Sequence, residues 1–277
     1  MKQSFMVLCV LVLLIANTAF AHHPSHVSSS GNTMSFNNGE VSKPRSEAYL
    51  SSELSHLDDS VGQLYTFNVG GEYAFNTRLS AGANLALLHV AHNFRPTQTG
   101  IGDIYINAKY LFWQSEKSFA YVATALGLPT GSSSDGLGRG ALSQQTSLSF
   151  ATMYKEWLFY TLMALDLGYE SDPTPLLVNT LGIVSPTFLK RLKAALVFTN
   201  QAYLASDVFT DGSGKLFIEP QLFINLTKQW LLTVSGRMSA YDYLQRSTAT
   251  TLTNTDNALL GDIFISGKIG ISYKFKN

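Results

Sequence analysis

The sequence predicts an all-β protein, a closed antiparallel transmembrane β-barrel of about twelve strands. Three observations predict this fold: strict alternation of apolar and polar residues near the end of the chain, a composition poor in charge and rich in aromatic residues, and a regular succession of short and long connections. An even strand number also predicts that both termini lie on the periplasmic side of the membrane.

The stretch from Gly261 to Phe275 alternates at period two. Successive side chains of a strand point to opposite faces, so one face is mostly apolar and the other, which carries Lys268, is mostly polar. The stretch is longer than a usual globular strand and fits a tilted membrane strand with its interface ends. Because a lysine in hydrocarbon costs about 2–4 kcal/mol, we expect Lys268 to face the lumen and Ile269 to face lipid.

The composition supports a membrane protein that makes no use of nucleic acid. Charged residues make up 14% of the chain, against roughly 25% in an ordinary soluble domain. The 19 basic and 19 acidic residues cancel, so there is no basic footprint for a nucleic acid. Thirteen Tyr and 17 Phe accompany this low charge, and we therefore expect membrane lipid to be the main partner.

Residues 1–21 have the features of a cleaved signal peptide. Lys2 supplies the positive charge, Met6 to Ala16 form the apolar segment, and Ala19-Phe20-Ala21 is the cleavage site. Export through such a signal predicts an outer-membrane location. Residues 22–45 are rich in Ser, Asn and His and are expected to form a flexible periplasmic arm, and residues 46–277 are expected to form the barrel.

The expected strands are 46–56, 63–75, 77–89, 102–113, 118–128, 143–154, 156–169, 176–188, 190–204, 215–226, 229–243 and 261–275. Short and long connections alternate between them, as in outer-membrane barrels with short periplasmic turns and long extracellular loops. Closure requires the last strand to pair with the first, since an open sheet edge is not stable in lipid.

Individual strands show where the two faces are distinct and where they are not. Tyr65, Phe67 and Val69 are expected to face lipid, opposite Thr66 and Asn68. The seventh strand is apolar on both faces, which predicts either a partly apolar inner wall or a packed neighbour there. Pro220 removes a ladder donor from the tenth strand, and this predicts a local bulge or, alternatively, a gap through which a ligand leaves sideways.

Charged residues on the inward faces are the candidate selectivity residues, because charge rings along a lumen set which solutes pass. They are Glu47, Glu53, Glu72, Arg78, Asp103, Lys109, Glu219, Arg237, Asp262 and Lys268, with Asp166 as a further candidate. Barrels of eight strands are filled by side chains and those of 16–18 are open. A twelve-stranded barrel lies between, so conduction and a salt-bridged, filled interior both remain possible.

The end of the chain resembles the C-terminal signal that the outer-membrane barrel assembly machinery reads. Lys268, Gly270, Tyr273 and Phe275 match its polar-x-Gly-x-x-aromatic-x-aromatic pattern, although two residues follow the last aromatic. The resemblance implies that the assembly machinery is a transient partner.

Two further motifs carry a resemblance to a family. Gly102-Asp103 with Lys109 recurs as Gly261-Asp262 with Lys268, and Leu126-Gly127-Leu128-Pro129-Thr130-Gly131 closes the fifth strand. In this layout the chain resembles the putative transporters associated with the meta-pathway of phenol degradation. The resemblance implies an outer-membrane channel for small apolar or aromatic compounds, and we expect their passage to be passive. The sequence has no G-x-S-x-G, P-loop or dinucleotide motif, so neither enzymatic activity nor a cofactor is expected.

The histidines and the barrel interior leave two other functions and a metal site as alternatives. An outer-membrane lipid hydrolase would need a serine, such as Ser60 or Ser143, beside His89 or His92. A closed barrel would serve as a surface-interaction or anchoring protein. His22, His23 and His26 are weak candidates for a copper or zinc site, and a solvated arm is the simpler interpretation, so no metal is expected.

Overall fold

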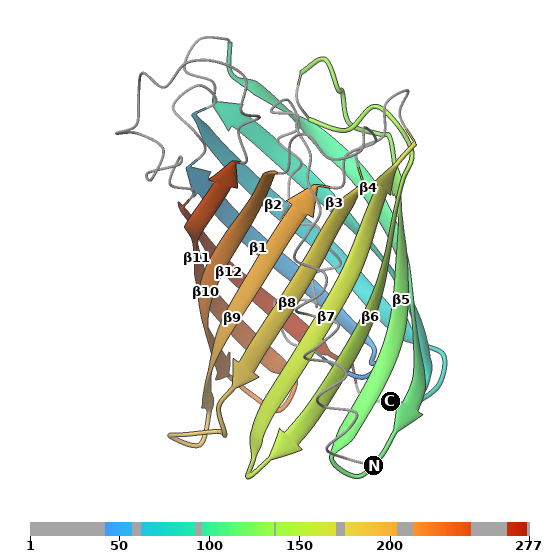
Figure 1. Cartoon of the computed structure of the whole chain (residues 1–277), viewed down its shortest axis with the longest axis vertical. Helices are drawn as coiled ribbons and strands as arrows, with labels where there is room; N and C mark the ends of the chain where they lie inside the picture. The colour runs from blue at the N-terminus through green and yellow to red at the C-terminus, as the bar shows by residue number, and fades with distance from the viewer. Residues whose placement is uncertain are drawn as a thin grey trace.

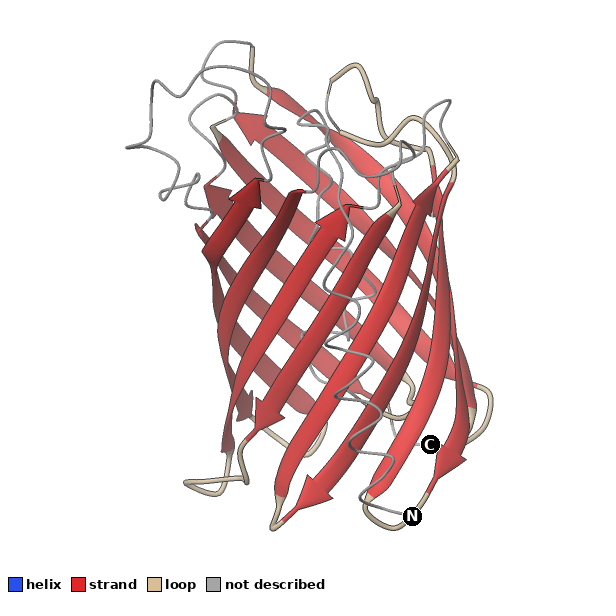
Figure 2. Cartoon of the chain, in the orientation of Figure 1, coloured by secondary structure: helices blue, strands red, loops and turns tan. Residues whose placement is uncertain are grey.

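A computed structural model describes residues 42–56, 62–91, 96–135, 137–169, 175–203, 213–244 and 265–275. These residues form one closed antiparallel barrel (Figures 1 and 2). Its strands are β1 (Glu47–His56), β2 (Gln63–Ala74), β3 (Leu79–Ala91), β4 (Gln98–Gln114), β5 (Ser118–Leu128), β6 (Ser143–Tyr154), β7 (Trp157–Gly168), β8 (Leu176–Val184), β9 (Leu192–Tyr203), β10 (Ser213–Asn225), β11 (Trp230–Leu244) and β12 (Ile265–Lys274). Within the described residues, no helix is long and apolar enough to cross a membrane.

Each strand pairs with its sequence neighbours, and β12 pairs with β1 to close the sheet. Glu53 lies opposite Lys268 in this closing ladder, and the Phe275 amide donates to the Ser46 carbonyl at 3.0 Å. The side chain of Ile269 is on the outer face and is 52% exposed. The predicted closed barrel is therefore confirmed, and its last strand has the expected register.

The barrel has two unlike ends, which we call the short-turn end and the long-loop end (Figure 2). β1 begins and β12 ends at the short-turn end (Figure 1). The turn from β6 to β7 consists of Lys155 and Glu156, both with positive φ (46° and 70°). Such a pair of left-handed residues makes a tight hairpin whose twist matches that of the strands.

Some strand bounds differ from those expected. β4 begins at Gln98 rather than at residue 102, because a bulge between Leu85 and Leu87 lets the ladder with β3 continue. β8 ends at Val184 and β9 begins at Leu192, because Leu189 and Lys190 adopt positive φ in a wider turn. Residues 261–264, expected to begin the last strand, lie outside the described residues.

Pro220 causes only a local irregularity. β10 is paired continuously with β9 through Pro220 opposite Leu196. On the other side, the pairing with β11 has a bulge between Leu216 and Phe217, continues to Ile218, is interrupted at Glu219 and Pro220, and resumes at Gln221. The pairing agrees with a local bulge and gives no support to a sideways opening.

The outer face is apolar and carries an aromatic girdle at the short-turn end. Exposed large apolar side chains occur on all the strands except β10, from Leu50 and Leu54 of β1 to Ile265 and Ile269 of β12, and Leu222 and Ile224 of β10 are half-buried. Trp230 packs against Tyr273 with ring centroids 4.9 Å apart, and Tyr73 packs against Phe75 at 5.2 Å. An apolar band bounded by aromatic residues is the surface that a transmembrane barrel presents to lipid.

Three inward tyrosines lie against glycines directly opposite them on the next strand. These pairs are Tyr49 with Gly70, Tyr105 with Gly127, and Tyr160 with Gly182. A Cβ atom added to any of the three glycines would overlap its tyrosine ring. Each ring is thereby held along the wall of the barrel, which leaves more of the lumen free.

Replacing Gly182 by Ala is expected to lower the free energy of unfolding by about 1–3 kcal/mol, since overpacking forces the Tyr160 ring off its place. Equilibrium urea unfolding in lipid vesicles, followed by tryptophan fluorescence, measures this change. Gly236→Ala is the matched control, because the nearest atom to its added Cβ is the Ser266 carbonyl oxygen at 3.7 Å. Equal effects of the two substitutions would contradict the packing described.

Candidate functional site

The lumen wall carries a row of four charged residues on neighbouring strands. Glu219 of β10 binds Arg237 of β11, whose Nε and Nη2 donate to its Oε2 at 2.9 and 2.7 Å. Lys268 of β12 and Glu53 of β1 face each other across the next ladder. Gln221 Nε2 donates to the second oxygen of Glu219 at 2.9 Å. The row thus holds two acidic and two basic groups and is balanced in charge.

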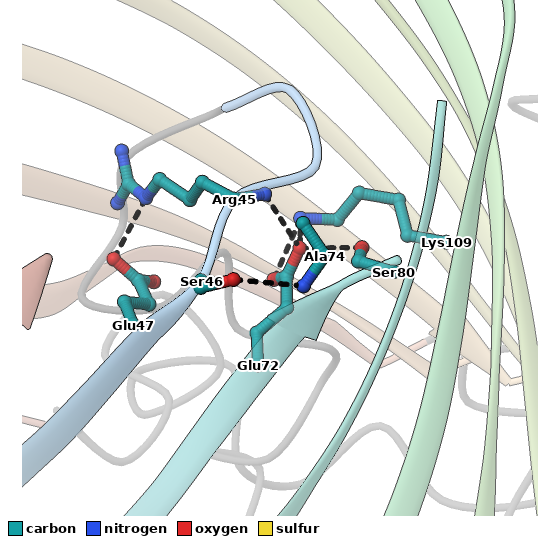
Figure 3. Close-up of polar contacts among 7 residues, drawn as sticks. All are labelled: Arg45, Ser46, Glu47, Glu72, Ala74, Ser80 and Lys109. Atoms are coloured by element: carbon teal, nitrogen blue, oxygen red, sulfur yellow. Dashed lines mark hydrogen bonds and ion pairs between the residues drawn. The ribbon is translucent and has the colours of Figure 1, made fainter. Parts of the chain in front are cut away.

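A second polar cluster centres on Glu72 of β2, near the short-turn end (Figure 3). Lys109 Nζ reaches across β3 and donates to both Glu72 oxygens at 3.2 and 3.0 Å. Ser80 Oγ donates to the same carboxylate at 2.5 Å, and the Arg45 amide lies 3.4 Å from it. The sequence predicted Glu72 and Lys109 as separate inward charges, and the structure brings them together.

The segment just before β1 lies inside the short-turn end. Arg45 Nε donates to Glu47 Oε2 at 2.7 Å, and Pro44 is buried. The Ala74 amide donates to Ser46 Oγ at 3.1 Å (Figure 3). Lys43 Nζ lies 5.5 Å from the ring centroid of Phe119 on β5, a strand remote from β1 in the sheet order. The segment therefore reaches from β1 towards the far wall.

The inner wall between β4 and β11 is apolar near the short-turn end. One contiguous buried cluster contains Leu111, Tyr121, Ala123, Ala151, Tyr160, Val184, Ala195, Val197, Phe223 and Leu231. A second cluster on β7 and β8 contains Leu162, Ala164, Leu176 and Val178. The doubly apolar character of the seventh strand is explained: its inner residues belong to these clusters. By contrast, the inner faces of β12, β1 and most of β2 are polar.

Asp103 lies near the long-loop end and holds the connection between β5 and β6. Its Oδ1 accepts the Gly131 amide at 3.0 Å, and its Oδ2 accepts the Arg139 amide at 2.8 Å. Thr130 Oγ1 donates to the Gly102 carbonyl at 2.9 Å. The Gly102-Asp103 motif and the motif ending in Gly131, which sequence reasoning noted separately, are thus in direct contact.

Arg78, one of the predicted lumen residues, lies in a turn rather than on a strand. Arg78 is exposed in the turn between β2 and β3, because β3 begins only at Leu79. Asn76 Oδ1 accepts the amides of Arg78 and Leu79 at 2.8 and 2.9 Å and so fixes this turn. Asp262 lies outside the described residues.

Arg139 and Leu137 are functional candidates that sequence reasoning missed. Arg139 forms two hydrogen bonds of 2.8 Å with the Asp166 carboxylate, and Leu137 is buried against the inner wall. Both lie in a Gly/Ser-rich connection without periodicity, so no pattern indicated their direction. The only available signal was their proximity in sequence to Pro129-Thr130-Gly131.

The described residues offer no triad and no metal cluster. His89 is exposed on β3, and its Nδ1 lies 2.7 Å from Thr99 Oγ1 rather than beside a serine. Ser143 is buried on β6, while Ser60 and His92 lie outside the described residues. No group of three or more His, Cys, Asp or Glu within the described ranges could hold a metal, and His22, His23 and His26 fall outside those ranges.

The residues of the predicted assembly signal lie on β12 and just after it. Tyr273 packs between Trp230 and Phe275, with centroids 4.9 and 5.1 Å away, and its hydroxyl accepts from Gln229 Nε2 at 3.0 Å. Gly270 is buried on the inner face. The aromatic part of the pattern therefore belongs to the outer girdle.

No protein-family model and no curated protein sequence matches this chain. Among solved structures, it is similar to an outer-membrane channel from Pseudomonas putida F1, with a TM-score of 0.65 and 10% identity over 87% of this chain and 98% of that one. It is also similar to the NanC porin, with a TM-score of 0.54 and 9% identity over 82% and 100% of the two chains. A third similar structure is the translocator domain of the autotransporter NalP from Neisseria meningitidis, with a TM-score of 0.51 and 8% identity over 83% of this chain and 88% of that one. The chain therefore has the fold of outer-membrane β-barrels, and its apolar outer band places it in that membrane.

Replacing Lys109 by Met is expected to lower the free energy of unfolding by about 1–3 kcal/mol, because it removes a partner from a buried carboxylate. Adding Glu72→Gln should restore part of the loss, since the uncompensated charge is then gone. A double-mutant cycle from urea unfolding in vesicles measures the coupling. Additive effects of the two substitutions would show that the pair of charges is not coupled.

Proposed function

We propose that the protein is an outer-membrane channel through which small apolar or aromatic molecules pass passively. The observation that carries this proposal is the division of the lumen wall. Charged and hydroxyl groups line the inner faces of β12, β1 and β2, whereas Leu162, Ala164 and Val178 line those of β7 and β8. A lumen with both surfaces can be wetted and can also attract an apolar solute.

The expected free energy of contact between a solute and the lumen wall suits passage rather than tight binding. Burial of apolar surface contributes about 25 cal/mol per Å², so contact with one wall of the lumen over roughly 100 Å² would contribute about 2–3 kcal/mol. Conduction requires binding that favours admission of a solute and yet is weak enough for release. The balanced row formed by Glu219, Arg237, Lys268 and Glu53 adds little net field to oppose a neutral solute.

The proposal includes an orientation. The short-turn end would face the periplasm, with both termini on that side, as is general for outer-membrane barrels. Residues 1–21 would be removed on export, and the part of the expected arm that precedes Lys43 would extend into the periplasm. The barrel assembly machinery would read Lys268, Gly270, Tyr273 and Phe275 during insertion.

The permeant class rests on two supports. One is the resemblance to the putative transporters associated with the meta-pathway of phenol degradation. The two motifs that carry this resemblance contact each other in this chain, where the Gly131 amide donates to Asp103. The other is the set of aromatic rings on the inner wall, among them Tyr121, Tyr160 and Phe223.

Planar-bilayer recording of the purified protein tests conduction. Discrete, reproducible current steps in potassium chloride are expected, and their complete absence from correctly folded protein would overturn the proposal in favour of a closed barrel. Heat-dependent migration on gels provides the folding control, because an intact barrel migrates differently from the unfolded chain.

Substituting Lys268 by Glu is expected to shift ion selectivity towards cations. The charged row would then hold three acidic groups and one basic group, and a lumen of one sign attracts the opposite ion. The reversal potential across a salt gradient measures the change. Lys228→Glu, at an exposed turn position, is the matched control, and an equal shift in both variants would show that Lys268 does not face the permeation path.

A further inference from the structure

The connection between β5 and β6 is folded onto the inner wall of the barrel. We call residues 129–142 the inward loop; all of them except residue 136 are described. The loop leaves β5 and returns to β6 at the long-loop end (Figure 2). It makes side-chain contacts with strands that are not its own.

The first set of contacts fastens the loop to β4. Both oxygens of the Asp103 carboxylate accept loop amides, those of Gly131 and Arg139. Thr130 Oγ1 donates to the Gly102 carbonyl at 2.9 Å and accepts from the Ile104 amide at 3.0 Å. Two amides that lie eight residues apart are thus held by one carboxylate, which closes the loop on itself as well as on the wall.

An apolar contact carries the loop further round the barrel. Leu137 is only 6% exposed and belongs to a buried cluster with Leu64 of β2 and with Ala86, Leu88 and Val90 of β3. A Cβ at Gly100 of β4 would lie 2.7 Å from Leu137 Cδ1. The loop therefore passes over β4 and packs on the inner face of β2 and β3.

An ion pair fixes the loop on the opposite side. The Arg139 guanidinium donates from Nη1 and Nη2 to the two oxygens of Asp166 on β7, each at 2.8 Å. The side chains of Arg139 and Asp166 are 20% and 13% exposed. Paired hydrogen bonds of this kind fix orientation as well as position. Contacts at Leu137 and Arg139 together spread the loop over the inner wall from β2 to β7.

Glycines make this close packing possible. A Cβ at Gly131 would overlap the Leu137 carbonyl, and a Cβ at Gly138 would lie 2.5 Å from Asp103 Oδ1. Gly140 has a φ of +73°, which other residues rarely adopt. The glycines of this Gly/Ser-rich connection therefore permit its inward conformation.

We propose that the inward loop is the element that sets the size limit of the channel at its long-loop end, and that Asp103 and the Arg139–Asp166 pair are the positioning residues that hold it there. This inference rests on the proposed channel function. The loop acts through its bulk rather than its charge, because Asp103 is bound to two amides, Arg139 to Asp166, and Asp135 to Ser132.

The test uses the full protein in planar bilayers and in liposomes that swell as neutral sugars permeate. In the double variant Asp103→Asn/Asp166→Asn, the side chain at position 103 has only one oxygen left to accept the two loop amides. The ion pair between Arg139 and residue 166 is also lost. We expect at least a two-fold higher single-channel conductance and permeation by sugars that the unaltered protein excludes. Glu116→Gln/Glu156→Gln, at exposed turn positions of the short-turn end, removes the same number of charges without touching the inward loop or its anchors and should leave both quantities unchanged.

A charge exchange separates position from charge. Arg139→Asp places two carboxylates together and should release the loop, whereas Arg139→Asp/Asp166→Arg restores the pair at the original net charge and should recover the lower conductance and the size limit. Heat-dependent gel migration shows that each variant is folded.

The outcomes distinguish this inference from the channel proposal. If the unaltered protein conducts and the releasing variants match it, the loop does not set the limit and the inference alone is overturned. If the unaltered protein does not conduct and the releasing variants do, the inward loop closes the barrel. That result would support the inference about the loop and would overturn passive passage through the unaltered protein. Silence of every folded variant would overturn both.

Discussion

The structure depends on the ladder between β1 and β12. Every backbone group in a lipid environment must find a partner within the protein, so a sheet can cross the membrane only if it has no edge. The register of Glu53 opposite Lys268 closes the sheet and, because side chains alternate, also decides which residues face lipid. A slip of one residue would turn Ile269 inward and Lys268 into hydrocarbon. One pairing thus fixes both the outer band and the composition of the lumen.

The lumen that results has an organisation beyond simple alternation. Charges from adjacent strands meet as Glu219 with Arg237, and charges two strands apart meet as Glu72 with Lys109. Tyrosines such as Tyr160 lie along the wall over glycines, which reconciles bulky inward residues with a passage. The segment around Lys43 at one end and the inward loop at the other lie within this lumen. The lumen is accordingly shaped at both ends, and its middle is divided between polar and apolar walls.

Sequence reasoning predicted the barrel, the strand number and the faces of most strands, because period-two alternation and turn length depend on local residues. It was less informative where a residue's position depends on where a strand begins, as at Arg78, which lies in a turn fixed by Asn76 rather than on β3. It also could not place Leu137 and Arg139, since their contacts join segments that no periodicity relates. The partners of Asp103 are backbone amides of a loop, and amides carry no sequence signal.

The central claim is that a neutral apolar solute interacts with the divided lumen as it passes. Single-channel recording in the presence of an uncharged aromatic alcohol, with a sugar of similar size as comparison, tests this most directly. The account predicts brief, concentration-dependent reductions in current with the aromatic solute and fewer with the sugar, and it predicts that replacing Leu162 and Val178 by Asn and Thr removes the difference. A conducting channel that responds equally to both solutes would contradict it.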